Sequence, residues 1–301
     1  MNLADQRILV TGGNGFLGTK VRDVLASRGA TDVIAPRSSE ADLRDPTACA
    51  RVVEGVDLVV HLAAHVGGIG LNREKPGELF YDNIIMGVQL MEAARKAGVK
   101  KFLTAGTICA YPNTTPVPFR EEDLWNGYPE ITNAPYGVAK KALLVMGQAY
   151  RLQYDFNAIF CLPVNLYGPN DNFDPASSHV IPALIKKIYD AKQLGVDELV
   201  CWGDGSATRE FLYVDDAADG LVTAAERLEC AEPVNLGTDF EISIKDLVEL
   251  LAKLMEYEGR IVWDTTKPNG QPRRRLDVSR AREWMDWEAQ VSFEEGLRRN
   301  I

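Results

Sequence analysis

The sequence is poor in cysteine and histidine and has no long apolar run. Its three histidines and five cysteines show neither Cys-x-x-Cys nor Cys-x-His spacing, so no metal centre is expected, and the odd number of cysteines does not indicate a disulfide framework. No apolar stretch approaches the roughly 18 residues that span a bilayer. The N-terminus, MNLADQRILV, lacks the basic segment and long apolar stretch of a secretion signal. We therefore expect a cytoplasmic protein without membrane attachment.

An excess of basic charge is also missing. The 301 residues carry a formal net charge of -10, which argues against a surface that binds nucleic acid or acidic membranes. Hydrophobic residues make up 46% of the chain and charged residues 25%, with both signs spread along its length. This composition is typical of one large globular domain, or of two smaller domains that share a sizeable core.

Short apolar runs alternate with helix-like segments through the first half of the chain. The run VDLVVHLAA (56–64) is too continuously apolar to have a solvated face, as expected for a strand in a parallel sheet covered on both sides. The alternation predicts an α/β fold with a Rossmann-type, doubly wound parallel sheet. The predicted strands are 7–12, 31–36, 56–64, 100–106 and 156–164, and the predicted helices are 19–29, 83–98 and 136–154.

The pattern changes after Leu166. Residues 167–179 are rich in Gly, Pro, Asn and Asp, which indicates a long functional loop. Further along, the sequence predicts a helix near 180–194, a strand at 198–202, a helix at 215–228, a strand at 233–237, and helices separated by loops over 244–299. We expect a nucleotide-binding domain of residues 1–165 plus about 211–236, and a smaller C-terminal α/β substrate domain of residues 166–210 and 237–301.

A glycine-rich turn joins the first predicted strand to the first predicted helix. In VTGGNGFLG (10–18), Gly12 allows the tight turn, Gly15 lets the backbone approach a pyrophosphate, and Gly18 lets the helix pack close to the sheet. The free N–H groups and the positive dipole end of the helix then face the phosphates. This context predicts a dinucleotide site.

The end of the second predicted strand indicates which dinucleotide binds. An acidic residue there would hydrogen-bond the ribose 2′-hydroxyl and repel a 2′-phosphate. The sequence has Arg37 instead, followed by two serines, and arginine is a natural partner for a phosphate. Glu40 and Asp42 lie close enough to leave NAD open as an alternative, but NADP(H) is favoured. Asp42 is expected to contact the adenine end.

Tyr136 and Lys140 are four residues apart, so on a helix they share a face. An ammonium group beside a phenol favours phenolate, so we expect Lys140 to lower the pKa of Tyr136. Such a phenol exchanges a proton with a carbonyl or alcohol oxygen while hydride moves to or from nicotinamide. Thr107, which follows the fourth predicted strand, is placed to steady the same oxygen.

Together these residues resemble the extended short-chain dehydrogenase/reductase superfamily. Six segments then resemble the GDP-L-fucose synthase family over nearly the whole chain: AAHVGGI (63–69), CAYP (109–112), TNAPYGVAKK (132–141), residues 162–185, residues 202–216 and residues 266–280. The resemblance implies NADPH, a homodimer, and a GDP-sugar substrate. It also implies a two-part reaction on GDP-4-keto-6-deoxy-D-mannose, namely epimerisation at C3 and C5 and then reduction of the C4 ketone, which gives GDP-L-fucose.

The resemblance assigns roles to residues that the bare pattern leaves open. Cys109 and His179 become the base and acid of the epimerisation, although an isolated cysteine after a strand is more often a core residue and His179 could simply cap the following helix. The implied substrate contacts are Asn165, Lys187, Trp202, Arg209 and Asp277. The expected cofactor contacts are Gly12, Asn14, Gly15, Phe16, Leu17, Gly18, Arg37, Asp42, Leu43, Leu62, Ala63, Ala64, Tyr136, Lys140, Pro163, Asn165, Leu166 and His179.

Three alternatives remain open at this point. Thr107 stands where serine is more usual in the family, and its methyl group crowds the pocket, so a related GDP-keto-sugar such as a 3,6-dideoxy or heptose analogue is one alternative. An NAD-dependent nucleotide-sugar C4 epimerase is a second. A non-catalytic NADP-binding module is the third and is least favoured, because all five residues of the expected catalytic set are intact.

Overall fold

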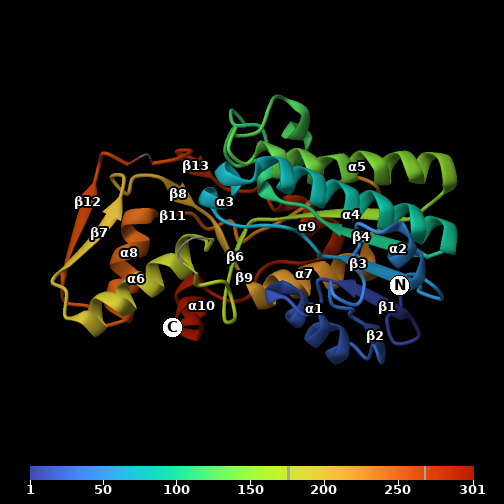
Figure 1. Ribbon diagram of the computed structural model, residues 1–301, viewed down its shortest axis with the longest axis horizontal. Helices are drawn as coiled ribbons and strands as arrows, with labels where there is room; N and C mark the ends of the chain where they lie inside the picture. The colour runs from blue at the N-terminus through green and yellow to red at the C-terminus, as the bar shows by residue number, and fades with distance from the viewer. Residues whose placement is uncertain (175–176, 268) are drawn as a thin grey trace.

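The computed structural model describes residues 1–174, 177–267 and 269–301. Positions 175–176 belong to the predicted loop 167–179, position 268 belongs to the segment 266–280, and both lie outside the described residues. Figure 1 shows an elongated molecule with a larger lobe that carries the N-terminus and a smaller lobe built from later parts of the chain. No helix in the described part of the chain is long and apolar enough to cross a membrane.

The larger lobe is built on a six-stranded sheet in the order β10-β5-β4-β3-β1-β2. All of its neighbouring strands are parallel. This confirms the predicted doubly wound sheet, in which the strand order reverses between β1 and β3, the point where open α/β sheets bind their ligands. The strands are β1 (Arg7–Thr11), β2 (Asp32–Ile34), β3 (Leu58–His61), β4 (Lys101–Ala105), β5 (Ala158–Pro163) and β10 (Val234–Leu236).

Helices cover both faces of this sheet. On one face α4 (Pro76–Ala97) packs against α2 (Pro46–Val52) and α5 (Ala134–Tyr154), and on the other α1 (Phe16–Ser27) packs against α7 (Val214–Arg227). The strands between them have no solvated face: Leu58, Val59 and Val60 are at most 1% exposed. Burial of each such side chain contributes roughly 1.5–3 kcal/mol, so the sheet is a rigid platform for the loops at its carboxyl edge.

The smaller lobe contains mixed short elements. Helices α6 (Val180–Leu194) and α8 (Ile244–Leu254) pack against each other, and β7 (Glu198–Trp202) pairs with β12 (Arg260–Asp264) in parallel. A three-stranded sheet has the order β11-β8-β13. Its strands are β8 (Thr208–Arg209), β11 (Ile242–Ser243) and β13 (Arg273–Arg274), and β6 (Asn165–Tyr167) pairs separately with β9 (Phe211–Tyr213).

The prediction of helices alone over 244–299 is wrong, because β12 and β13 lie in this region. Each pairs with a strand at least 60 residues earlier in the chain, so no local signal marks them. The helices there are α8, α9 (Ser279–Met285) and α10 (Phe293–Asn300). The remaining short elements of the chain are α3 (Ile69–Glu74), η1 (Ile108–Ala110) and η2 (Glu121–Trp125).

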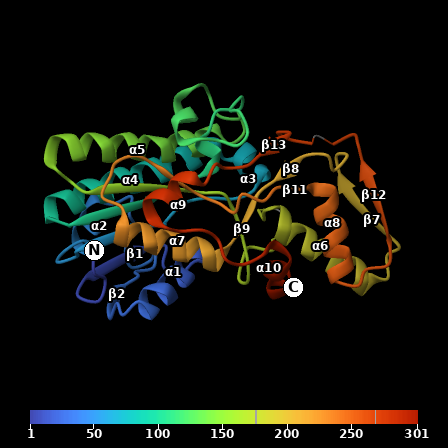
Figure 2. The ribbon, with the colours of Figure 1, turned by 180° about the vertical axis from the view of Figure 1, so that it is seen from behind.

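Two hydrophobic cores suggest a division into domains. The larger core contains Leu276, Ala281 and Trp287 from the C-terminal third, and the smaller contains Leu297. Figure 2 shows α9 from behind, beside α7 of the larger lobe, and α9 contacts both α7 and β10. We therefore propose the two domains expected from the sequence, with the segment around α9 counted in the nucleotide-binding domain.

Candidate active site

The glycine-rich turn between β1 and α1 leaves no room for side chains. Gly12 has a φ of 70°, and a Cβ atom added to it would lie 2.9 Å from the backbone nitrogen of Ala63. A Cβ atom on Gly18 would lie 2.1 Å from the carbonyl oxygen of Gly12. Gly15 precedes the first residue of α1 and provides no side-chain cap. The first-turn N–H groups of α1 therefore remain available to an anion such as a pyrophosphate.

The acidic residues after β2 are already engaged. The Glu40 carboxylate accepts a hydrogen bond of 2.7 Å from the backbone nitrogen of Arg37, and the Asp42 carboxylate accepts two from the guanidinium of Arg44. Within the described residues, no hydrogen bond or ion pair occupies the Arg37 guanidinium, which is exposed. Among these side chains after β2, the charge that remains without a partner is therefore the positive charge of Arg37.

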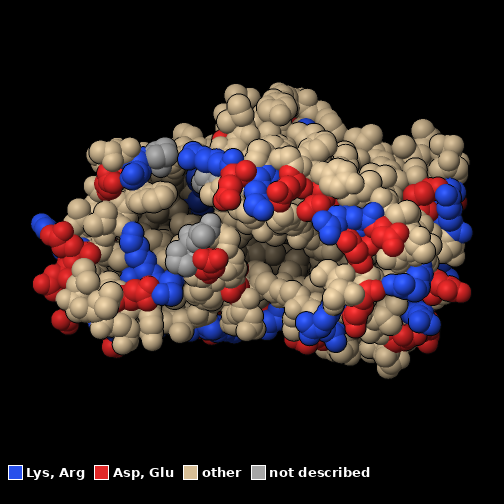
Figure 3. All heavy atoms as spheres, viewed as in Figure 1, with Lys and Arg blue, Asp and Glu red and all other residues tan. Residues whose placement is uncertain are grey.

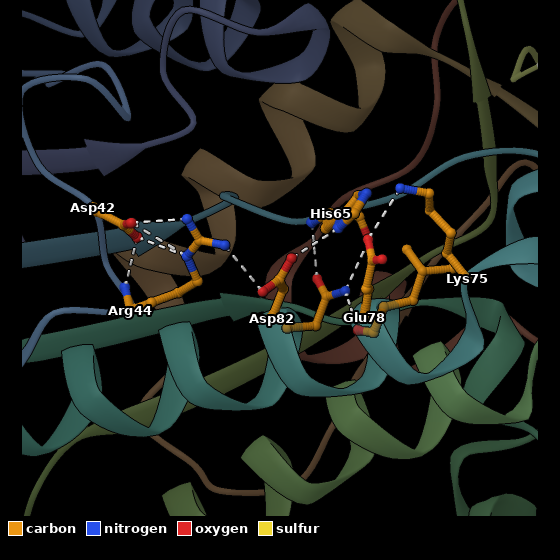
Figure 4. Close-up of polar contacts among 8 residues, drawn as sticks. Asp42, Arg44, His65, Lys75, Glu78 and Asp82 are labelled. Atoms are coloured by element: carbon orange, nitrogen blue, oxygen red, sulfur yellow. Dashed lines mark hydrogen bonds and ion pairs between the residues drawn. The ribbon is translucent and has the colours of Figure 1, made fainter.

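Figure 4 shows a row of alternating charges along α4. Arg44 links Asp42 to Asp82 of α4, and Asp82 in turn lies 2.9 Å from Nδ1 of His65, in the loop after β3. Asn83 fixes the same loop, since its side chain accepts a hydrogen bond from the His65 backbone nitrogen and donates one to its carbonyl oxygen. This network holds the loops after β2 and β3 against one helix, on either side of the predicted adenosine site.

Tyr136 and Lys140 lie on the first two turns of α5, and Lys140 is only 2% exposed. Burial lowers the pKa of Lys140 to about 8. Burial also raises the pKa of Tyr136, with a smaller contribution from Cys109. The expectation that Lys140 lowers the phenol pKa is therefore wrong, because the loss of solvation dominates and raises this pKa.

Thr107 and Cys109 lie in one tight turn after β4. The Thr107 hydroxyl caps η1 by accepting a hydrogen bond of 3.2 Å from the backbone nitrogen of Cys109. A Cβ atom on Gly137 would lie 2.3 Å from the carbonyl oxygen of Cys109, so the start of α5 presses directly against this turn. The structure thus brings the hydroxyl, the thiol and Tyr136 together at the carboxyl edge of the sheet.

His179 immediately precedes α6 but does not cap it, since no hydrogen bond joins its side chain to the helix. Its ring is accessible, yet the surrounding protein restricts its hydration and lowers its pKa. The approach to His179 docks on the loop after β3, where the backbone nitrogen of Gly68 donates a hydrogen bond of 2.9 Å to the carbonyl oxygen of Ser177. This contact places the His179 segment beside the dinucleotide edge of the sheet.

Two arginines lie side by side in the smaller lobe. Arg209 of β8 is in register with Arg274 of the parallel strand β13. Burial, with a smaller contribution from the charge of Arg274, lowers the pKa of Arg209 to about 10. Two guanidinium groups that repel each other and are short of water form a favourable site for a bound anion. Figure 3 shows a hollow in this face of the molecule where the two lobes meet.

The profile of the NAD dependent epimerase/dehydratase family matches residues 8–237, which is most of the chain. The chain belongs to this family. The relative named "Probable GDP-L-fucose synthase 1" of Oryza sativa subsp. japonica is 41% identical over 98% of this chain and 91% of its own length. "GDP-L-fucose synthase" of Escherichia coli (strain K12) is 36% identical over 98% of this chain and 95% of its own length.

A solved structure extends the comparison to three dimensions. The GDP-L-fucose synthetase of Naegleria fowleri bound to NADP superposes with a TM-score of 0.90 and is 30% identical, over 99% of this chain and 92% of that chain. The chain is therefore an enzyme of this family that uses a nicotinamide dinucleotide.

The remaining predicted substrate residues are only partly brought together in this family member. Asn165 donates a hydrogen bond of 2.9 Å to the carbonyl oxygen of Glu210, next to Arg209. Trp202 is 68% exposed, and the Lys187 ammonium donates to the carbonyl oxygen of Val200. Asp277 is directed elsewhere: its carboxylate accepts a hydrogen bond of 2.9 Å from the Ser279 nitrogen and lies 3.6 Å from Arg120, on a surface depression.

Sequence reasoning missed three residues of this epimerase/dehydratase. Arg274 is one of three consecutive arginines (273–275), and nothing in that run marks it out, yet it lies opposite Arg209 on the neighbouring strand and donates a hydrogen bond to the Cys109 thiol. Gln271 orients it, and Glu210, fully buried, fastens the end of β8 to the loops around Asp239 and Leu276. The only sequence signal was the cluster of charged residues in WGDGSATREF and QPRRRLDV.

Proposed function

We propose that the protein converts GDP-4-keto-6-deoxy-D-mannose to GDP-L-fucose by epimerisation at C3 and C5 and reduction at C4. One observation carries this proposal beyond the fold: a thiol lies in the turn that also presents the Thr107 hydroxyl, and that turn abuts the start of the helix bearing Tyr136 and Lys140. A reductase needs only the hydroxyl, the phenol and the lysine. The thiol adds a base, which is required to invert carbons beside a ketone.

The epimerisation uses the acidity of the protons on the carbons that flank the C4 ketone. Cys109, as thiolate, removes such a proton, and the electron pair moves onto the C4 oxygen to give an enolate. Thr107 and Tyr136 donate hydrogen bonds to that oxygen. His179 then delivers a proton to the opposite face of the carbon, the C4 carbonyl re-forms, and the configuration is inverted. His179 and Cys109 return to their starting states by proton exchange with solvent.

The reduction uses the same oxygen site. NADPH, when bound, supplies hydride to C4. Tyr136 gives its proton to the C4 oxygen as the alcohol forms, and the Lys140 ammonium stabilises the phenolate left behind. Holding the C4 oxygen in one place lets a single pocket serve both halves of the reaction.

The cofactor is held by the glycine-rich turn and by the loops after the strands. Gly12 and Gly18 allow the backbone to pack too closely for a Cβ atom, and the uncapped first turn of α1 beside them fits a pyrophosphate. The uncommitted Arg37 guanidinium supports the choice of NADPH, since the two nearby carboxylates are engaged with other donors.

Replacing Arg37 by serine is expected to weaken NADPH binding and leave NADH binding unchanged. Loss of a charged hydrogen bond to the 2′-phosphate costs roughly 1.5–3 kcal/mol, which corresponds to an increase of about 10- to 100-fold in Kd. Fluorescence titration with both nucleotides measures the effect. Arg7→Ser, at the amino end of β1 and therefore at the opposite edge of the sheet, is the matched control. Equal affinity of Arg37→Ser and the unchanged protein for NADPH would contradict this role.

The diphosphate of the substrate is assigned to Arg209 and Arg274, and Lys187 of α6 is retained as a further proposed cation of the smaller lobe. The unsatisfied positive charge of the Arg209–Arg274 pair supports this assignment. The exposed face of Trp202 is proposed to stack on the guanine, and Asn165 to lie between the sugar and the nicotinamide. Asp277 is retained as a proposed contact, although its present partners hold it away from this set.

We also propose a cytoplasmic homodimer formed through α4 and α5. Tyr81 of α4 and Val145 and Leu152 of α5 are exposed apolar side chains on this helix pair, and Leu152 is 91% exposed. Exposed apolar stripes on neighbouring helices are typical of a subunit interface.

Leu152→Glu is expected to yield monomers at micromolar concentration, because a carboxylate would be buried at the interface without a partner. Light scattering after gel filtration measures the mass against 33.2 kDa for one chain. Leu194→Glu, at a 77% exposed position at the end of α6, is the control that should leave the dimer intact. A monomeric unchanged protein would contradict the proposed dimer.

A single product spectrum tests the proposed function. Purified protein is incubated with GDP-4-keto-6-deoxy-D-mannose and NADPH in deuterated water. Deuterium at C3 and C5, together with a reduced C4 in the L-galacto configuration, is the expected NMR result. Recovery of unlabelled ketone by protein that is folded and binds NADPH would refute the proposal, and incubation with 3,6-dideoxy and heptose analogues would then identify a related substrate.

A further inference from the structure

Cys109, the base assigned to the epimerisation, belongs to the nucleotide-binding domain. One of its neighbours, Arg274, comes from far along the chain. Arg274 of β13 extends its guanidinium to Cys109, and Nη1 lies 3.9 Å from Sγ, across 165 residues of sequence. This distance is within the range of an N–H to sulfur hydrogen bond. The contact joins the smaller lobe directly to the turn after β4.

Arg274 differs from both of its neighbours in the basic run. Arg273 pairs with Glu241 at 2.5 Å, and Arg275 pairs with Asp239 at 2.7 Å. Within residues 1–174, 177–267 and 269–301, Arg274 has no carboxylate partner. A neutral amide holds it instead, since its Nε donates a hydrogen bond of 2.6 Å to the side-chain oxygen of Gln271. Its positive charge is therefore fixed in direction and forms no direct ion pair, although it lies close enough to Glu130 to help lower the pKa of that carboxyl group.

Gln271 orients this guanidinium through the two polar atoms of its side chain. While its oxygen accepts from Arg274, its side-chain nitrogen donates a hydrogen bond of 3.1 Å to the carbonyl oxygen of Asn113, four residues after Cys109. The Cys109 turn and the Arg274 strand are thus connected at two points. This arrangement orients a cation toward a sulfur atom, as in the electropositive surroundings of reactive cysteines.

We propose that Arg274 is a positioning residue that orients the Cys109 sulfur and stabilises the negative charge on it when Cys109 removes the sugar protons. This inference rests on the proposed function for its purpose, but the contact itself is a feature of the fold. Two other ionisable groups near the Arg274–Cys109 pair supply no positive charge beside the sulfur. Tyr136 of α5 is uncharged when Cys109 must ionise, and the Glu130 carboxylate is committed to Thr132 and Asn133.

The test measures the reactivity of Cys109 directly, without sugar or nucleotide. The full-length protein is alkylated with iodoacetamide between pH 5.5 and 9.5, and the rate at each cysteine is followed by peptide mass spectrometry. Because iodoacetamide reacts with the thiolate, Arg274→Gln is expected to slow alkylation of Cys109 at pH 7 roughly tenfold and to move its pH profile upward by about one unit. Arg274→Lys, which keeps the charge, should restore most of the rate.

The chain supplies its own controls. Arg273→Gln removes the same charge one residue away, from a side chain directed at Glu241, and should leave the Cys109 profile unchanged. Cys230, which is also partly exposed, reports on general access in every variant. An unchanged Cys109 profile in Arg274→Gln, or an equal shift in Arg273→Gln, would overturn the proposal.

The outcome of the alkylation test can be distinguished from the outcome of the test of the proposed function. If Arg274→Gln slows alkylation but the unchanged protein labels no GDP-keto-sugar in deuterated water, the contact stands and the assigned reaction fails. If the reaction is confirmed and Arg274→Gln raises only KM while alkylation of Cys109 is unaffected, Arg274 serves the diphosphate alone and the positioning role is refuted.

Discussion

Replacing Cys109 by serine is expected to lower deuterium incorporation at C3 and C5 of GDP-4-keto-6-deoxy-D-mannose by roughly 10²- to 10⁴-fold, the range measured for the loss of a positioned general base. A serine hydroxyl keeps the hydrogen bond and nearly the same volume, but it does not ionise near neutral pH. The NMR spectrum that tests the function provides the measurement. Any C4 alcohol that forms should carry no label at either carbon.

The companion variant His179→Gln should give a different pattern. Cys109 would still remove the proton, exchange it with solvent and return deuterium to the same face, so label is expected to enter without inversion. Fluorescence titration with NADPH checks that neither variant has lost the cofactor. Normal inversion at C3 and C5 in Cys109→Ser would remove the thiol from the mechanism and assign the removal of the proton to another group.

The fold was predictable where a signal is local. The helix at Val180–Leu194 matches its prediction because it lies between a loop rich in turn-forming residues and Gly195, which has a φ of 63°. Strand β13 was missed because Arg273–Arg274 is a charged dipeptide whose strand geometry comes from pairing with β8. Such long-range pairing leaves no periodicity in the sequence.

The candidate site was predictable for residues in recognisable motifs, and not for their electrostatics. The spacing of Tyr136 and Lys140 places both on α5. It contains no measure of desolvation, which depends on everything packed around the two side chains and reverses the expected shift of the Tyr136 pKa. The contact between Arg274 and Cys109 likewise joins residues that no local pattern connects.

Tyr136→Phe is expected to lower the rate of C4 reduction by about 10²- to 10⁴-fold, because the alkoxide would lose its proton donor in a site with little water. Deuterium exchange at C3 and C5 should fall less, since Thr107 still donates a hydrogen bond to the enolate oxygen. Stopped-flow loss of NADPH absorbance measures the reduction, and the NMR exchange rate measures the other half. An equal loss in both halves would contradict separate roles for Tyr136 and Cys109.

The pH dependence of the reduction rate is an independent test of the Tyr136–Lys140 pair. Burial lowers the pKa of Lys140 to about 8, so its ammonium form is present below this pH and is lost as the pH rises through it. If the ammonium stabilises the Tyr136 phenolate, the rate of reduction should fall above pH 8. Lys140→Met should be slow at every pH and should lack this decline. A decline above pH 8 that persists in Lys140→Met would assign the titration to another group, and the role of Lys140 would then reduce to holding the cofactor.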